Sequence, residues 1–313
     1  MAKKLPKLTN ENYYDPEVRS KYMNVHTYLD YVGSLGRQGC EARAEAIRKG
    51  EWQEEEKSLA LMVGSYVDAF FDDSLDQFKA ENPDLFAYSD EITDREGLKE
   101  RHPELFTRNG NLKSEWSLVK IKASFPEEIT TTWRLKAPYR QAETMIERCL
   151  KDDYFMATMS GEKQKIFTAD MFGCTWCCKL DSYIPDTAIV DLKTTSDLHK
   201  SWRVPDAGYV SCVEYWGYTT QLAVYQEIVR INTGKRLPCY LSFVTKEDSP
   251  EICVVNVDQQ TLDHALESVR MNMPQVLAVR NGELEPIRCE CCDYCKATKK
   301  IKGPISMYDL ISE

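Results

Sequence analysis

Two aspartates and a lysine stand near the ends of two apolar segments in the middle of the chain. Asp181 is followed ten residues later by Asp191-Leu192-Lys193. Carboxylates supply the hard oxygen ligands that Mg²⁺ takes while it keeps several waters. An ammonium group beside them can orient a water or neutralise an attacked phosphate. These residue types at this spacing favour metal-assisted hydrolysis of a phosphodiester.

The geometry of a strand would bring these groups together. Side chains alternate across a strand, so Asp191 and Lys193 share one face and Leu192 points to the other. The pair Pro185-Asp186 predicts a turn, and a hairpin across it would bring Asp181 near Asp191. A solvated strand end with a lysine salt bridge is the alternative interpretation, and for an isolated Asp-x-Lys it is the commoner one.

The rest of the chain predicts the elements that would carry these groups. Helical periodicity and apolar alternation predict, in order, helices over 25–50, 57–75 and 136–158, strands over 162–171, 174–183 and 187–194, a long helix over 213–232, strands over 239–245 and 251–257, and a helix over 259–280. This order indicates an α/β fold in which a mixed central sheet is flanked by helices.

Composition narrows the class of protein. The chain has 313 residues, of which 42% are hydrophobic and 29% charged, as in a soluble globular protein. No stretch approaches the roughly 20 apolar residues of a membrane span, and the first residues lack the apolar core of a secretion signal, so we expect a cytoplasmic protein. The net charge of −10 weighs against a wholly basic surface for nucleic acid. It is compatible with a single basic channel.

The long predicted helix carries an amide and a phenol on one face. Gln221 and Tyr225 are four residues apart and therefore neighbours on the helix surface. Beside a metal site they could bind a phosphate or position the lysine. An ordinary amphipathic helix, with Tyr225 among the residues that face the core, is the alternative interpretation.

Taken together, Asp181, Asp191-x-Lys193 and Gln221-x-x-x-Tyr225 resemble the PD-(D/E)XK nuclease superfamily. Within it they are most similar to the RecB-type branch, and there to the nuclease domain of the RecE (exonuclease VIII) family and its phage relatives. The resemblance covers roughly residues 28–298 and implies a restriction-endonuclease-like core.

The resemblance also implies a division of the chain. Residues 1–24 would be an N-terminal arm, 25–298 a single RecE-like nuclease domain, and 299–313 a C-terminal tail. Within the domain we expect a helical insertion over about 76–135, where charged residues and prolines predict short helices and loops. The catalytic core would span about 136–280, and a cysteine-rich tail 288–298.

The resemblance assigns roles around a Mg²⁺ or Mn²⁺ site. Asp181 and Asp191 would bind the metal, and the Leu192 carbonyl would add a ligand. Lys193 would activate or orient the attacking water. The Gln221 and Tyr225 pair would hold the DNA backbone or support the lysine.

Two further metal ligands follow from the same resemblance. The family's helix with a glycine resembles 61–71 here, with Gly64, and would supply Asp68 where the family usually has a histidine. Aspartate is also a hard-metal ligand. Glu162, at the start of the strand before Asp181, matches a glutamate that the family often carries there.

The resemblance implies an exonuclease that degrades linear duplex DNA from its ends. Members of the family often form homo-oligomeric rings and act in recombination beside a single-strand annealing, RecT-like protein. Two other functions are alternatives here. One is a structure-specific endonuclease of the same superfamily, and the other is a non-catalytic DNA-binding or assembly protein.

Twelve cysteines in a chain without a recognisable export signal favour reduced thiols or metal ligands over disulfides. Cys289, Cys292 and Cys295 have the two-residue spacing of metal and iron–sulfur ligands. A fourth ligand would come from Cys291 or from a distant cysteine. Cys40 is the candidate, because AddB-type nucleases of the same branch hold a [4Fe-4S] cluster with one cysteine before the core and three after it. Zinc and unliganded thiols are the alternatives. A bound metal would tie the two ends of the chain together, which is a folding role.

Overall fold

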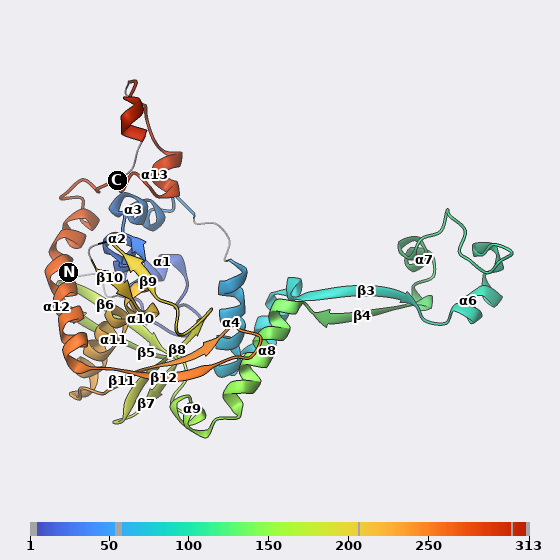
Figure 1. The fold of residues 1–313 in the computed structure, drawn as a ribbon, viewed down its shortest axis with the longest axis horizontal. Helices are drawn as coiled ribbons and strands as arrows, with labels where there is room; N and C mark the ends of the chain where they lie inside the picture. The colour runs from blue at the N-terminus through green and yellow to red at the C-terminus, as the bar shows by residue number, and fades with distance from the viewer. Residues whose placement is uncertain (1–4, 54–57, 206, 302, 311–313) are drawn as a thin grey trace.

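A four-stranded mixed sheet forms the centre of the computed structural model, which describes residues 5–53, 58–205, 207–301 and 303–310. The strands lie in the order β12-β11-β8-β7 (Figure 1). The parallel pair is β8 (Ala188–Thr195) and β11 (Cys239–Thr245), while β7 (Ser182–Ile184) and β12 (Ile252–Val257) are antiparallel to their neighbours. A hairpin of β5 (Lys165–Met171) and β6 (Cys174–Leu180) precedes the sheet. The predicted α/β fold with a mixed sheet is confirmed.

Helices cover both faces of this sheet. On one face, α11 (Tyr218–Thr233), α12 (Gln259–Arg280) and α2 (Val25–Val32) enclose the larger apolar core. On the other, α4 (Leu59–Phe71), α8 (Ala137–Leu150) and α9 (Asp153–Thr158) enclose a second core. Strand β8 serves both, because Ile189 packs into the first core and Ala188, Val190 and Leu192 into the second. The alternation predicted for this strand is therefore confirmed.

The predicted strand over 174–183 is interrupted at Asp181, which lies between β6 and β7. From there β7 turns back on β8 through residues 185–187, and Ser182 pairs with Val190. Asp186 supplies the turn with a left-handed φ of 59°, which aspartate adopts more readily than most residues. The hairpin predicted from the Pro185-Asp186 pair is thus present.

Two expected helices are also interrupted. The segment 25–50 contains α2 and α3 (Glu41–Arg48), separated by the short hairpin of β1 (Gly33–Ser34) and β2 (Arg37–Gln38). The segment 213–232 divides into α10 (Cys212–Tyr215) and α11 at Gly217, which has a φ of 74°. A left-handed residue cannot continue an α-helix, so the chain changes direction there and α11 begins afresh.

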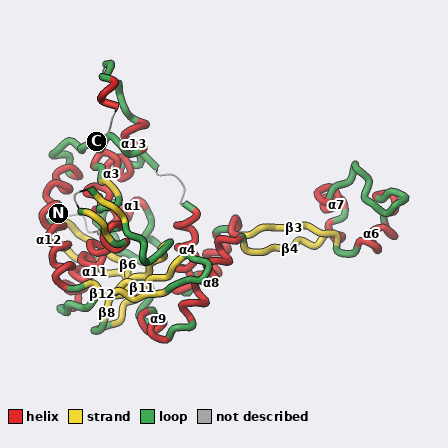
Figure 2. Tube along the Cα trace, in the orientation of Figure 1, coloured by secondary structure: helices red, strands yellow, loops and turns green. Residues whose placement is uncertain are grey.

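The insertion over 76–135 is an arm that projects from the body (Figure 2). Its stalk is the antiparallel pair β3 (Phe86–Ile92) and β4 (Ile129–Leu135), and α5 (Leu75–Glu81) lies at its base. The head contains α6 (Arg95–Arg101) and α7 (Leu118–Ser124), which pack around their own small core of Leu98, Leu105, Phe106 and Ile121. The expectation of short helices and loops was wrong for the stalk, which is a pair of strands. The residues of the head separate these two strands in the sequence, so no short turn marks them as a hairpin.

The predicted N-terminal arm packs against the body. Residues 1–4 lie outside the described residues, while α1 (Pro16–Arg19) and its neighbours contact the β5–β6 hairpin. Met23 donates its N–H to the Thr175 carbonyl over 2.9 Å and accepts from the Cys177 N–H over 2.8 Å. Residues 8–23 therefore contribute buried side chains, among them Leu8 and Tyr22, which a detached arm would not do.

The remaining elements complete the body. A small hairpin of β9 (Trp202–Val204) and β10 (Gly208–Val210) precedes α10, and α13 (Asp293–Ala297) and the 3₁₀ helix η4 (Met307–Leu310) end the described chain. No helix within the described ranges combines the length and the apolar character that crossing a membrane would require.

Candidate active site

The break at Asp181 places its carboxylate beside β8. The last pair between β7 and β8 joins Ser182 and Val190, and beyond it the Leu192 N–H donates to Asp181 Oδ2 over 2.9 Å. Because the N–H and C=O of a strand residue point to the same side of the strand, the Leu192 carbonyl also points toward Asp181. The sequence prediction that Asp181 would lie near the Asp191-x-Lys193 segment is borne out by this geometry.

Asp191 is held from the neighbouring helix. Its Oδ1 accepts a hydrogen bond of 2.8 Å from Gln221 Nε2, and the same nitrogen donates to the Tyr225 hydroxyl over 3.0 Å. Gln221, Tyr225 and Asp191 are all buried. Gln221 and Tyr225 are thus part of the core and are also linked to Asp191 by hydrogen bonds. The helix is therefore both an ordinary core-facing helix and a support for the acid.

Lys193 forms a close ion pair with Asp191. Its Nζ lies 2.5 Å from Asp191 Oδ2, but that oxygen has no well-directed hydrogen bond from the described residues, so the contact is electrostatic. The ammonium also lies 4.8 Å from the ring centre of Tyr218. Burial disfavours the charged lysine, yet the Asp191 and Asp181 carboxylates outweigh burial and raise its pKa. Lys193 therefore stays protonated beside the acids.

Asp68 reaches the same cluster from α4. Its side chain is exposed by surface area, although enough protein atoms surround the carboxylate to disfavour its charged form. That burial, with Asp72 and Asp191 nearby, raises its pKa to about 7 although Lys193 opposes the shift. Burial followed by the charges of Asp191 and Asp68 also raises the pKa of Asp181 well above its usual value.

Gly64 sets the approach of α4 to the strand. A Cβ at this position would lie 3.0 Å from Thr194 Oγ1, next in sequence to Lys193. The glycine therefore lets the helix pack close to β8, one turn before Asp68.

The donor set fits a divalent cation. Three carboxylates interact electrostatically here, and burial followed by their mutual repulsion raises the pKa values of Asp68 and Asp181. A bound cation would relieve that repulsion, while Lys193 already compensates the buried Asp191 Oδ2 over 2.5 Å. Oxygen-only ligands with the Leu192 carbonyl alongside suit Mg²⁺ or Mn²⁺.

Glu162 does not join this cluster. Its backbone pairs with that of Tyr183, but its exposed carboxylate accepts a hydrogen bond of 2.6 Å from Lys165 Nζ. The expectation that it completes the metal shell is corrected by this contact, since a surface ion pair already engages it. Glu162 does lie just before β5, where the family carries its glutamate, but its side chain is directed to Lys165 and not to the acids.

Several groups around the cluster were not singled out from the sequence. Asp72, Lys163, Lys179 and Tyr14 all interact electrostatically with Asp181, with Asp68 or with each other. The sequence positions of two of these residues could have identified them. Asp72 is four residues after Asp68 and so shares its helix face, and Lys179 is two residues before Asp181 and so shares its strand face.

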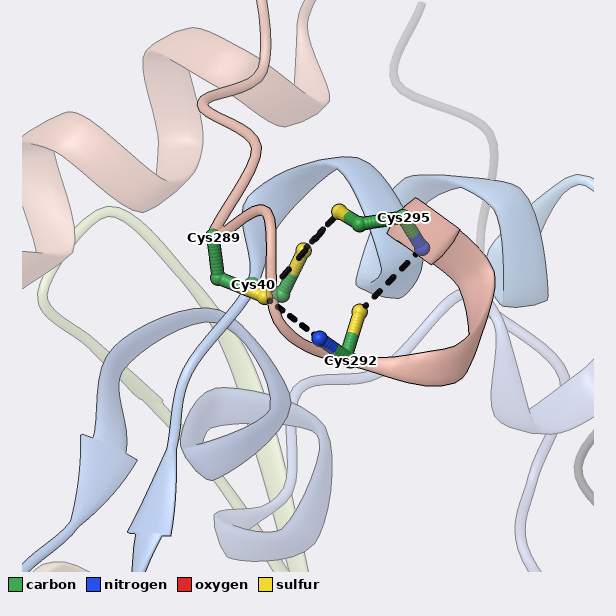
Figure 3. Close-up of side chains that lie close together, drawn as sticks. All are labelled: Cys40, Cys289, Cys292 and Cys295. Atoms are coloured by element: carbon green, nitrogen blue, oxygen red, sulfur yellow. Dashed lines mark hydrogen bonds between the residues drawn. The ribbon is translucent and has the colours of Figure 1, made fainter. Parts of the chain in front are cut away.

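The four predicted cysteine ligands form a second centre (Figure 3). The Sγ atoms of Cys40, Cys289, Cys292 and Cys295 all lie within 4.8 Å of one another. Cys40 and Cys295, 255 residues apart, are separated by 3.6 Å. Cys40 precedes α3 and Cys292 precedes α13, so the centre joins the two ends of the chain.

Backbone N–H groups point at these sulfurs. Cys289 accepts from the Cys292 N–H over 3.3 Å, Cys292 from the Cys295 N–H over 3.5 Å, and Cys40 from the Arg43 N–H over 3.4 Å. Burial raises the pKa of Cys289, but the N–H groups of Cys291 and Cys292 outweigh it and lower the pKa to about 6. Donors of this kind favour thiolate, the form that binds metal, whereas burial raises the pKa of Cys40, Cys292 and Cys295. The close grouping of the four sulfurs is what fits a metal. Cys291 is exposed and is not one of the four.

A mixed sheet that carries Asp191-x-Lys193 on its inner strand β8, with Asp181 beside that strand, defines the PD-(D/E)XK nuclease class of fold. Within it, the chain belongs to the family described as the PDDEXK-like domain of unknown function (DUF3799), whose model matches residues 32–298. The superfamily predicted from the sequence is thereby confirmed.

A solved structure is similar to nearly the whole chain. It is the crystal structure of a "putative exonuclease" from Eubacterium rectale, 43% identical, with a TM-score of 0.79, covering 97% of this chain and 98% of that one. The crystal structure of SSO0001 is 14% identical over 56% of this chain and 69% of that one, and its TM-score of 0.23 supports no argument. Among curated proteins, none matches.

Proposed function

We propose that the protein is a divalent-metal-dependent nuclease that degrades linear duplex DNA from its ends. The observation that carries the proposal is that the carboxylates of Asp68, Asp181 and Asp191 all interact electrostatically with Lys193, a half-buried lysine of the inner strand β8. The relative from Eubacterium rectale, which is named a "putative exonuclease", supports the choice of DNA ends over internal sites.

The acids of the site would bind the metal, and the residues of α11 would support them. A bound Mg²⁺ or Mn²⁺ would supply an activated water and would neutralise charge on the attacked phosphate. Asp181, Asp191 and Asp68, with the Leu192 carbonyl, would hold the ion. Gln221 fixes the Asp191 carboxylate in place and is itself held by Tyr225.

Lys193 acts as a fixed positive charge. In the metal-free protein its raised pKa keeps it protonated at neutral pH, and as an ammonium it would orient the attacking water and offset the charge that develops on the phosphate. The Tyr218 ring beside its ammonium restricts where that charge can point.

The test compares linear and closed-circular duplex DNA, each with Mg²⁺ and with EDTA. We expect loss of linear DNA alone, no loss in EDTA, and no activity in Lys193→Ala with the fold retained by circular dichroism. Cleavage of closed circles would favour a structure-specific endonuclease. Binding of DNA without any cleavage would favour a DNA-binding or assembly protein.

The resemblance to RecE-type enzymes supports further proposals. The protein would act in recombination beside a single-strand annealing, RecT-like protein in the cytoplasm of a bacterium or of a phage-infected host, and it would form a homo-oligomeric ring. Light scattering on the purified protein tests the ring, and a monomer at micromolar concentration would contradict it. Co-purification with an annealing protein encoded near its gene tests the partner.

The cysteine centre is proposed to hold a structural metal. A zinc ion bound by four thiolates at about 2.3 Å separates neighbouring sulfurs by about 3.8 Å, which is close to the spacing here. The Cys-x-x-Cys-x-x-Cys run also matches iron–sulfur ligation, in which each sulfur binds a different iron. Anaerobic purification, metal analysis and absorbance near 400 nm decide between zinc and a [4Fe-4S] cluster.

A further inference from the structure

Two half-buried lysines lie beside the carboxylate cluster and have no close ion-pair partner. Lys163 precedes β5 and Lys179 lies in β6, and neither ammonium is within 4.0 Å of a carboxylate among the described residues. The Lys163 ammonium donates only to the Met159 carbonyl. Removing an ammonium group from water is costly when no anion compensates it. For Lys179 the rings of Tyr13 and Tyr14 offset part of this cost.

Both lysines belong to backbone segments that adjoin Asp181. Lys179 is two residues before Asp181, and the backbone of Glu162, next to Lys163, pairs with that of Tyr183. Asp72 and Asp181 interact electrostatically with both ammonium groups, but no carboxylate among the described residues pairs with either one closely. An anion between the two ammonium groups would supply that missing close partner.

Tyr14 places an exposed aromatic ring beside Lys179. Its ring centre lies 4.7 Å from Lys179 Nζ and 5.1 Å from the ring centre of Tyr13, which meets it edge to face. Tyr13 is fixed beneath, with Lys179 5.4 Å from its ring and Cys177 Sγ 4.0 Å from its hydroxyl. Tyr14 itself is 63% exposed. One aromatic face is thus available to a base or sugar, as in other sites that hold single strands.

We propose that Lys163, Lys179 and Tyr14 form a phosphate-binding subsite, which holds a phosphate of the DNA other than the one being cleaved. The inference rests on the proposed nuclease function and deepens it. Net charge does not oppose it, because the sign of the local charge decides where a polyanion binds. The phosphate is either an internal diester of the strand or a terminal monoester at its end.

The experiment uses Lys163→Gln, Lys179→Gln and the double variant, with Lys165→Gln as the matched control. Lys165 lies in the same hairpin, but its ammonium pairs with Glu162 at the surface. We expect each subsite variant to raise KM on linear duplex DNA about tenfold with kcat little changed, as for loss of a charged hydrogen bond. The control should match the wild type.

Binding measured with Ca²⁺ in place of Mg²⁺ separates a phosphate contact from a structural effect. Loss of each lysine should reduce the slope of log affinity against log salt by about one, and Lys179→Arg should retain it. Tyr14→Phe should bind like the wild type and Tyr14→Ala more weakly, because the ring and not the hydroxyl lies beside Lys179.

Duplexes with 5′-phosphate, 3′-phosphate or hydroxyl ends show whether the bound phosphate is terminal or internal. An effect confined to one phosphorylated end assigns a terminal monoester, and an equal effect on all ends assigns an internal diester. Variants that behave like Lys165→Gln in both KM and salt slope would overturn the subsite. Absence of cleavage by the wild type would instead count against the nuclease, and the salt slopes would still test the subsite.

Discussion

Gln221, in the first turn of α11, donates a hydrogen bond of 2.8 Å to Asp191 of β8, and both side chains are buried. This bond fixes one carboxylate oxygen and leaves the other facing Lys193. A carboxylate that must bind a metal gains from such support, because its orientation is set before the ion arrives.

We expect Gln221→Ala to raise the Mg²⁺ concentration for half-maximal activity and to lower activity about 10- to 100-fold, as for other partners of metal ligands. The measurement is a Mg²⁺ titration of the cleavage rate. Gln226→Ala is the control, since Gln226 is buried on the same helix but donates to the Leu237 carbonyl. It should lower stability and leave the Mg²⁺ requirement unchanged. Equal Mg²⁺ curves for the two variants would refute the role of Gln221.

Asp68 and Asp181 should make the metal-free protein less stable as the pH rises. Their raised pKa values mean that these two carboxyl groups bind more protons in the folded state than in the unfolded chain. This difference holds between about pH 4, the ordinary aspartate value, and the pKa of about 7 for Asp68. In that window these two groups lower the free energy of unfolding as the pH rises, while His26, whose pKa burial lowers to about 4, acts in the opposite direction.

Thermal unfolding in EDTA from pH 5 to 8 measures this effect. Asp68→Asn removes one titrating group, so its Tm should fall less steeply with pH than that of the wild type. Addition of Mg²⁺ should stabilise the wild type most at the alkaline end, where the carboxylates are ionised. If Tm falls equally with pH in the wild type and in Asp68→Asn, the pH dependence does not come from the Asp68 carboxyl group.

Gly64 and Thr194 should be energetically coupled. Alanine favours a helix over glycine by about 1 kcal/mol, but a Cβ at Gly64 would lie 3.0 Å from Thr194 Oγ1. We expect Gly64→Ala to give little of that gain in the wild type and most of it once Thr194→Ala removes the hydroxyl. A double-mutant cycle of urea unfolding measures the coupling, and additive effects would contradict close packing of α4 on β8.

Loss of a ligand from the cysteine centre should destabilise the junction of the two ends. Cys40→Ser should remove the bound metal and lower the Tm by about 5–10 °C, because a tie between distant segments is lost. Cys291→Ser is the matched control, as Cys291 is in the same tail but outside the four-sulfur group. If both variants keep the wild-type metal content and Tm, the centre is a set of free thiols.

Local pattern accounts for the strands and helices that bear the site. Alternation along 187–194 and the Pro185-Asp186 turn predict β8 and its hairpin, and periodicity predicts α4, α11 and α12. The same local signals fail where partners are distant. The stalk of the arm pairs residues on either side of an independent head, and Gly217 interrupts a helix through a backbone angle that its neighbours do not reveal.

Residue types and spacing single out Asp181, Asp191, Lys193, Gln221 and the tail cysteines as groups capable of chemistry, while Asp68, Glu162 and Cys40 follow from the resemblance to the family. Packing between elements decides which of these groups meet. It turned Glu162 toward Lys165, brought Asp68 across from another helix, and placed Tyr14, Lys163 and Lys179 around Asp181. The physical reason is that spacing fixes which face of an element a side chain occupies, while only packing between elements fixes what that face meets.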